Sequence, residues 1–312
     1  GRKPGQLRDL DNCMSCASFE RMEEKRAIDP AGAAALTGFA LLLAFNQVVI
    51  KITGSGFAPV FQAGLRSAGA VLVLLIWMRA RGLPLTLPRG TLPWAVLSGL
   101  VFAFEFTCLY IALDHTTVAR ASIIFYSMPV WLGLAAHLWL PGERITGLRA
   151  LGMALAMGGV ALALADRSNG QASLLGDLLA LIAALGWASI ILLMRMTPLS
   201  RVSPVMQLFF QVLVSAPVLL AAAPLFGALT RDPQTIHYLG LAFQTICVVS
   251  LGFLLWFHLM SIYRASGVAS FSFLSPVFAV LFGWLILGER IGPPVWIALA
   301  LVAAGIVLIN RK

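Results

Sequence analysis

The sequence predicts an all-α integral membrane protein with ten transmembrane helices, arranged as two inverted five-helix repeats. Three observations lead to this fold class: an extreme composition, ten apolar runs of bilayer-spanning length, and a repetition of the first half in the second. Hydrophobic residues make up 60% of the 312-residue chain and charged residues only 11%, whereas soluble domains carry about 25% charged residues. A soluble fold of this size cannot bury so much apolar surface, so the lipid bilayer is the expected solvent.

The ten apolar runs each approach the length of about 20 residues that a membrane span needs. Polar or helix-breaking segments, such as residues 79–84 and 168–170, separate them. Residues 1–30 carry six basic and six acidic side chains and are expected to form a polar, partly disordered cytoplasmic tail. We predict helices near 32–50, 59–78, 92–113, 116–140, 147–165, 174–194, 203–223, 237–262, 266–287 and 293–310.

The net charge of +9 predicts the orientation of the chain through its distribution. Of the 22 Lys and Arg residues, 16 fall on the side of the expected membrane that holds both termini, and two lie within spans. The other side receives only Lys51, Arg167, Arg231 and Arg290. Because cytoplasmic loops are enriched in Lys and Arg, both termini are expected inside the cell, with the helices in the inner membrane. The basic residues form no stripe that could follow phosphates, so nucleic-acid binding is not expected.

The second half of the chain repeats the first at an offset of 145 to 147 residues. The matched features are Pro59 and Pro204, Pro129 and Pro276, and the tetrapeptide Gly-Glu-Arg-Ile at 142–145 and 288–291. Residues 31–165 and 174–310 are therefore expected to form the two repeats. Because five is an odd number, the two copies cross the membrane in opposite senses. Inverted repeats are typical of carriers that work by alternating access, with the substrate near the middle of the bilayer.

These features resemble a known family. An early proline, a second proline in the middle of each copy, and Gly-Glu-Arg before a last helix rich in small residues are similar to the drug/metabolite transporter superfamily, EamA type, which includes YddG-like amino-acid exporters. The resemblance covers about residues 32–310. It implies a central cavity lined by the first four helices of each half, with the fifth and tenth helices as outer supports. It also implies a secondary transporter, not an enzyme, that moves small organic metabolites, with amino-acid-like solutes and export favoured.

Few ionisable side chains lie within the expected spans, and such residues are functional candidates because charge is costly inside a membrane. Arg66 and Glu105 lie at matching depth, roughly 10 Å and 12 Å below the outer ends of their helices by the rise of an α-helix. We expect them to form a buried ion pair, which either faces the substrate cavity or locks two helices together. Glu105 is the candidate for proton coupling. Arg120 is expected to meet Glu105, Asp114 or an anionic substrate group, or else to reach the membrane interface.

Uncharged polar and aromatic side chains complete the predicted substrate site, with ordinary packing as the alternative for each aromatic ring. Amides inside spans must find partners, and flat rings suit a ring-bearing solute. Besides Arg66, Glu105 and Arg120, the candidates are Asn46, Gln47, Gln62, Tyr110, Tyr126, Trp187, Gln207, Gln211 and Trp256. Pro129 and Pro276 are expected well inside helices four and nine, as moving joints or as static kinks.

Small residues recur at every fourth position in two of the predicted helices. They are Ala150, Ala154 and Gly158 in helix five, and Ala300 and Ala304 in helix ten. Faces of this kind allow helices to approach closely. The contact is expected within one chain, with a homodimer through helices five and ten as the alternative.

Other function classes lack their motifs in this sequence. There is no G-x-x-x-x-G-K-[ST] loop to hold ATP phosphates, and the halves share no charged ring of the kind that lines a channel. A membrane enzyme needs clustered carboxylates, histidines or a nucleophile with its base, and no such cluster stands out. Cys13 and Cys16 form one C-x-x-C without a second pair, so neither a metal nor another cofactor is expected. A lipid scramblase or a lipid-modifying enzyme is the alternative to a carrier.

Overall fold

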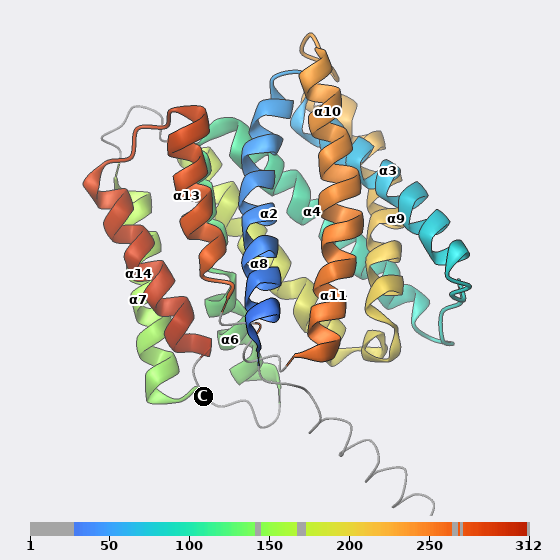
Figure 1. Ribbon diagram of the computed structural model, residues 1–312, viewed down its shortest axis with the longest axis horizontal. Coiled ribbons are helices and arrows are strands. Elements are labelled where there is room, and N and C mark those ends of the chain that lie inside the picture. Colours follow the sequence, from blue (N-terminus) through green and yellow to red (C-terminus); the bar gives the residue numbers. More distant parts are fainter. Residues whose placement is uncertain (1–27, 141–144, 167–172, 264–267, 269–270, 311–312) are drawn as a thin grey trace, which may run out of the picture.

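The structure is a computed structural model in which ten membrane-spanning helices follow one another in the predicted order (Figure 1). It describes residues 28–140, 145–166, 173–263, 268 and 271–310. Most of the expected tail at 1–30, and residues 142–144 of the first tetrapeptide, lie outside the described residues. The first half contains α2 (Pro30–Gly54), α3 (Pro59–Ala80), α4 (Leu92–His115), α5 (Val118–Phe125), α6 (Met128–Trp139) and α7 (Gly147–Ala165).

The second half has more interruptions than the first. Its elements are α8 (Leu174–Met196), the 3₁₀ turn η1 (Pro198–Arg201), α9 (Pro204–Ala222), the 3₁₀ turn η2 (Ala223–Phe226), α10 (Thr235–Phe243), the π-helical η3 (Gln244–Gly252), α11 (Phe253–Ile262), α13 (Leu274–Leu287) and α14 (Pro293–Asn310). The elements α10, η3 and α11 together form one continuous span, as do α5 and α6 in the first half.

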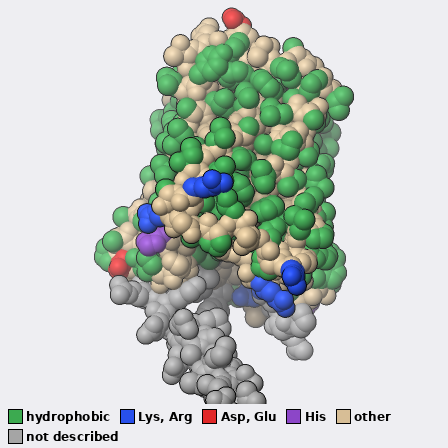
Figure 2. Space-filling view, turned by 90° about the vertical axis from the view of Figure 1, so that its right-hand side faces the viewer, with side chains coloured by type: hydrophobic (Ala, Val, Ile, Leu, Met, Phe, Trp, Pro, Cys, Tyr) green, Lys and Arg blue, Asp and Glu red, His purple; other side chains and the backbone are tan. Residues whose placement is uncertain are grey.

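Apolar side chains cover most of the face of the helix bundle that Figure 2 shows. Large residues such as Leu72, Ile76 and Leu138 are 62%, 70% and 72% exposed. An apolar surface of this extent is not stable in water and needs a lipid environment. Within the described residues, nine helices are long and apolar enough to cross a membrane, and the shorter apolar α13 is the tenth. The chain is therefore a multi-pass membrane protein.

The halves pack together in a pattern that matches their repetition. α3 lies along α9, α5 lies against α13, and α7 lies along α14. Each of these pairs joins a helix to its own counterpart in the other repeat, which is what a two-fold axis in the membrane plane produces. The start of α2 and the end of α14 lie at the same end of the bundle (Figure 1). We call that end inner and the opposite end outer, following the predicted orientation.

The prolines of spans four and nine lie within those spans, at breaks between helical segments, and their role as moving joints or static kinks stays a prediction. α5 ends at Phe125, and α6 starts at Met128 after a turn, which places Pro129 in the first turn of a new helix. Pro276 likewise lies in the first turn of α13, after the turn at 271–273. A proline near the start of a helix is tolerated because the first N–H groups have no partner within the helix. Each proline therefore begins a half-helix inside the membrane.

α7 and α14 touch through small residues, but not through the predicted ones. A Cβ atom added to Gly152 would lie 2.8 Å from the carbonyl oxygen of Gly305, so the two backbones are in direct contact. The predicted small residues point elsewhere and are exposed: Ala150, Ala154, Gly158, Ala300 and Ala304. The prediction that those residues pack within one chain is therefore wrong. The contact uses another face of the helix, because a shift of two positions rotates the direction of a side chain by about 200°. A homodimer through the exposed stripe stays a prediction.

Candidate functional site

Buried polar side chains gather around α3, α4 and the π-helical segment η3. We call them the central cluster: Gln62, Arg66, Glu105, Tyr110 and Gln244, each at most 1% exposed. Four of the five were predicted as site residues. α3 and α4 bring them together because both helices turn their polar positions toward the interior of the bundle and their Leu-rich faces outward.

Gln244 connects the central cluster to the second half. Its side-chain oxygen accepts hydrogen bonds from the hydroxyl of Tyr110 (2.8 Å) and from Nε2 of Gln62 (3.2 Å). Its Nε2 atom donates to the hydroxyl of Thr53 on α2 (3.2 Å). Gln244 is the first residue of η3, and π-helical turns occur frequently at functional sites. The sequence analysis missed this residue, although a lone amide within a long apolar run was a signal of the kind that marked Gln62.

The predicted ion pair between Arg66 and Glu105 does not form. Both side chains are buried, yet no N–O distance within 4 Å joins them among the ion pairs of the described residues. The guanidinium carbon of Arg66 lies 3.9 Å from the centre of the Phe106 ring and 5.3 Å from that of Tyr110, a cation–π arrangement. Glu105 points instead toward α8, where a Cβ atom added to Gly186 would lie 2.9 Å from Cβ of Glu105. Successive positions on a helix differ by 100° in direction, so Glu105 and Phe106 face different neighbours.

Helices α2, α3 and α4 carry buried polar atoms that have no hydrogen-bond partner in the protein. These atoms are Oδ1 of Asn46, Oε1 of Gln62, Nε and Nη2 of Arg66, and both carboxylate oxygens of Glu105. An unpaired buried polar group costs roughly 1–3 kcal/mol, and a charged one costs more. Groups left unpaired by the protein itself are suited to bind a solute, a proton or water. The central cluster is therefore the candidate binding site.

Two other predicted amides join helices on either side of the central cluster. Gln47 of α2 accepts a hydrogen bond from the hydroxyl of Ser122 on α5. Gln211 of α9 donates to the hydroxyl of Ser98 on α4 (3.0 Å). By the repeat, Gln211 is the counterpart of Arg66. The amide of Gln211 has a hydrogen-bond partner, whereas two nitrogens of the Arg66 guanidinium have none.

Gln207 lies outside the central cluster. Its Nε2 atom donates to the carbonyl oxygens of Leu199 and Val202, at 2.8 Å each. These bonds hold the 3₁₀ turn η1 at the inner end of the bundle. The structure therefore gives Gln207 a role in a turn, and its inclusion in the predicted substrate site is not supported by this placement.

The predicted aromatic side chains divide into two groups. Trp187 lies 6.3 Å from Phe125, and Phe125 lies 5.5 Å from Tyr126, so these rings pack around the break in span four. Trp256 stacks on Phe39 with ring centres 4.9 Å apart, toward the inner ends of α2 and α11. Phe253 connects the two groups, because its ring centre lies 6.5 Å from that of Trp187 and 6.4 Å from that of Phe39.

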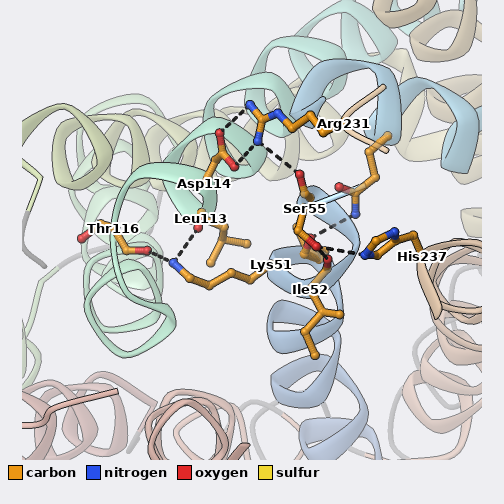
Figure 3. A network of polar contacts seen from close by, with 11 residues as sticks. Lys51, Ile52, Ser55, Leu113, Asp114, Thr116, Arg231 and His237 are labelled. Atoms are coloured by element: carbon orange, nitrogen blue, oxygen red, sulfur yellow. Dashed lines mark hydrogen bonds and ion pairs between the residues drawn. The ribbon is translucent and has the colours of Figure 1, made fainter. Parts of the chain in front are cut away.

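A second set of charged side chains lies at the outer end of the bundle, and Figure 3 shows three of its members, Lys51, Asp114 and Arg231. We call it the outer cluster: Lys51, Asp114, Arg120, Asp177, Arg231 and Glu289. Arg231 of the second half donates to the two carboxylate oxygens of Asp114 at 2.7 and 2.9 Å, and to the carbonyl oxygen of Gly54 at 3.1 Å. The hydrogen bond to Asp114 raises the pKa of Arg231 above its usual value. Lys51 donates to the carbonyl oxygens of Leu113 (3.0 Å) and Thr116.

Arg120 meets none of the partners that the sequence suggested. Its Nη2 and Nε atoms bond the two oxygens of Asp177 on α8, at 2.7 and 3.3 Å. The hydroxyl of Thr116 donates to the same carboxylate at 2.9 Å. Arg120 and Asp177 are 4% and 0% exposed, and a two-bond pair between guanidinium and carboxylate is a strong one. Asp177 escaped prediction because it lies in the first turn of α8, where an acidic residue is common for any helix.

Comparison with known proteins agrees with the fold and with the two halves. Residues 30–165 and 174–311 match the EamA-like transporter family. The chain is 30% identical over 287 residues to the uncharacterized transporter YvbV of Bacillus subtilis (strain 168), which covers 88% of this chain and 92% of the relative. It is 27% identical over 273 residues to the probable amino-acid metabolite efflux pump of Escherichia coli (strain K12), covering 84% and 88%. A protein of known crystal structure shares the fold, with a TM-score of 0.61 and 23% identity over 88% of this chain and 96% of that one.

Proposed function

The chain belongs to the EamA-like transporter family, and on this premise we propose that it is a secondary carrier that exports small amino-acid-like metabolites across the cytoplasmic membrane by alternating access. Transport across a membrane follows from the family and from the ten helices. The solute class, the direction and the mechanism are the proposal. The printed name of the Escherichia coli relative supports the solute class.

The unpaired charges of the central cluster carry the proposal. Arg66 can bind a carboxylate and Glu105 can bind an ammonium group, and two nitrogens of Arg66 and both carboxylate oxygens of Glu105 have no hydrogen-bond partner in the protein. An amino acid carries an ammonium and a carboxylate group on the same carbon atom, so one solute would compensate both side chains. A solute without charges would leave the buried guanidinium of Arg66 without a counter-charge, at a cost of several kcal/mol. An amino-acid-like solute therefore fits the site best.

The inverted halves support alternating access. The outer cluster joins the halves at one end, which supports a state closed on that side. Broken spans such as α5 with α6 suit a rearrangement because fewer backbone hydrogen bonds must change at a turn than within a helix. Glu105 is the proposed proton carrier, since a buried carboxylate without a partner takes up a proton at low cost.

The test is solute counterflow with purified protein in proteoliposomes. Vesicles preloaded with an unlabelled amino-acid mixture are given radiolabelled amino acids outside, and the native protein is compared with Glu105→Gln. Ser189→Ala is the control, because Ser189 is exposed on α8 and bonds only its own helix. We expect saturable exchange by the native protein and the control, and loss of exchange or of its pH dependence in Glu105→Gln.

Two other outcomes would change the assignment. Exchange of amino acids that is equal in Glu105→Gln and the native protein would keep the carrier but remove Glu105 from the site. If folded native protein exchanges no amino acid, the proposed solute class fails. Movement of a fluorescent phospholipid between leaflets in the same vesicles would then favour the scramblase alternative.

A further inference from the structure

The turn between α13 and α14 places a buried carboxylate of the second half on the first half. Glu289 is 5% exposed. Its Oε1 atom accepts a hydrogen bond from the backbone N–H of Val118 at 2.6 Å, and its Oε2 atom accepts one from that of Ala119 at 3.0 Å. Val118 and Ala119 are the first two residues of α5. The free N–H groups and the positive end of the helix dipole make this end of α5 a favourable position for a carboxylate.

Two glycines of α13 allow this placement. Gly288 ends α13 with a φ of 64°, a left-handed conformation that favours glycine, and the chain turns back there. The N–H of Glu289 then donates to the carbonyl oxygen of Gly283 at 3.1 Å. A Cβ atom added to Gly283 would lie 2.5 Å from Oε2 of Glu289, so the carboxylate occupies the space that a side chain there would fill.

The pKa of the Glu289 carboxyl is raised, mainly by burial, although the N–H groups of Ala119 and Val118 and the positive charge of Lys51 act to lower it. The guanidinium of Arg120, on α5, is bound to Asp177. The carboxylate of Glu289 is therefore held by the backbone donors of α5.

We propose that Glu289 is the latch of the outer gate, the contact that must be released before the central cluster opens to the outer side. This role rests on the proposed alternating access. Glu289 binds the N-terminus of α5, and Ser122 of the same helix bonds Gln47 in the interior. Movement of α5 away from Glu289 would therefore also displace the contact of Ser122 with Gln47 at the wall of the site. The ion pair of Arg231 with Asp114 is a weaker candidate because its side chains are 43% and 23% exposed, and water screens such pairs.

The experiment measures access to the space beneath the gate. Ser122→Cys is introduced into a chain whose four native cysteines are replaced by alanine, and a membrane-impermeant maleimide is added from the outer side. Three variants are compared in this background: Glu289→Ala removes the carboxylate, Gly283→Ala displaces it without changing any charge, and Asp232→Asn alters an exposed outer acid. Asp232 has a φ of 61°, which asparagine tolerates well.

We expect labelling of Cys at position 122 to be about tenfold faster in Glu289→Ala and in Gly283→Ala, the effect of losing a charge-assisted contact, and unchanged in Asp232→Asn. Equal labelling rates in all variants would overturn the latch. If Glu289→Ala does not elute as a folded protein in detergent, Gly283→Ala and the shorter Glu289→Asp decide the question by the same criterion. Counterflow by the native protein is measured in parallel, so failure of the carrier proposal is visible separately from failure of the latch.

Discussion

The two halves share one repeat, but their charged side chains lie in different places and make different contacts. The first half holds the unpaired charges, and their counterparts in the second half are uncharged: Gln211 stands where Arg66 would be, and Gly252 where Glu105 would be. In the second half, the charged side chains of Asp177, Arg231 and Glu289 instead contact the first half at the outer end of the bundle. The shared scaffold therefore does not need the charges of the first half, which supports the proposal that they bind the solute.

The third and eighth spans show the same division in their backbones. α4 is one continuous helix and has the largest buried share of the described spans, 61%. Its counterpart contains the π-helical η3, which starts at Gln244 and ends at Gly252. π-helical turns occur frequently at functional sites, and this one begins at the amide that joins the central cluster. One repeat therefore yields a regular helix in the first half and an interrupted one in the second.

The largest effect is expected at the charged position that distinguishes the two halves. Arg66→Ala removes the guanidinium that is proposed to bind the carboxylate of the solute, so we expect solute counterflow to fall by about 100-fold or more, consistent with the roughly 2–5 kcal/mol lost when one partner of a buried charged contact is truncated. Gln211→Ala, at the equivalent position of the second half, is the matched control and should reduce counterflow only a few-fold. Equal losses in the two variants would show that the halves contribute alike.

The next effect concerns the residue that joins the halves at the site. Gln244→Leu keeps the size of the side chain but leaves the polar atoms of Tyr110, Gln62 and Thr53 without this partner. We expect a loss of roughly 2–4 kcal/mol in the free energy of unfolding, seen as a lower midpoint of thermal unfolding in detergent. An unchanged midpoint would mean that these atoms find other partners.

A smaller effect is expected where α7 meets α14. Gly152→Ala places a methyl group against the carbonyl oxygen of Gly305, and overpacking of this kind costs about 1–3 kcal/mol. Gly158→Ala is the matched change on the same helix, because a Cβ atom there meets no other atom within 4 Å. Gly152→Ala should therefore lower the midpoint of thermal unfolding, and Gly158→Ala should leave it nearly unchanged. Destabilisation by Gly158→Ala alone would point to a contact on the exposed stripe, as in the predicted homodimer.

The smallest effect is expected at the partly exposed ion pair of the outer cluster. The coupling energy between Arg231 and Asp114, measured by a double-mutant cycle with Arg231→Gln and Asp114→Asn, should be about 0–1 kcal/mol. It should fall further at high salt because exposed charges are screened. A coupling energy well above this range would make the Arg231–Asp114 pair a main contact of the outer gate and weaken the proposal for Glu289.

The sequence by itself determined the number, order and position of the ten spans, the family and the two repeats. It could do so because the bilayer demands long apolar runs and because repeated motifs are visible without a structure. It also placed Arg66 and Glu105 correctly among the buried residues of α3 and α4. These features depend on length, composition and local pattern alone.

Only the tertiary structure decided which side chains meet. Matching depth suggested an ion pair between Arg66 and Glu105, but a rotation of one residue turns a side chain by 100°, and packing sent Glu105 toward α8. The partners Arg120 with Asp177, Tyr110 with Gln244, and Glu289 with the start of α5 are separated by 57, 134 and about 170 residues in the chain. Contacts over such distances depend on how ten helices are rotated and paired, which is a property of the packed bundle and not of any one span.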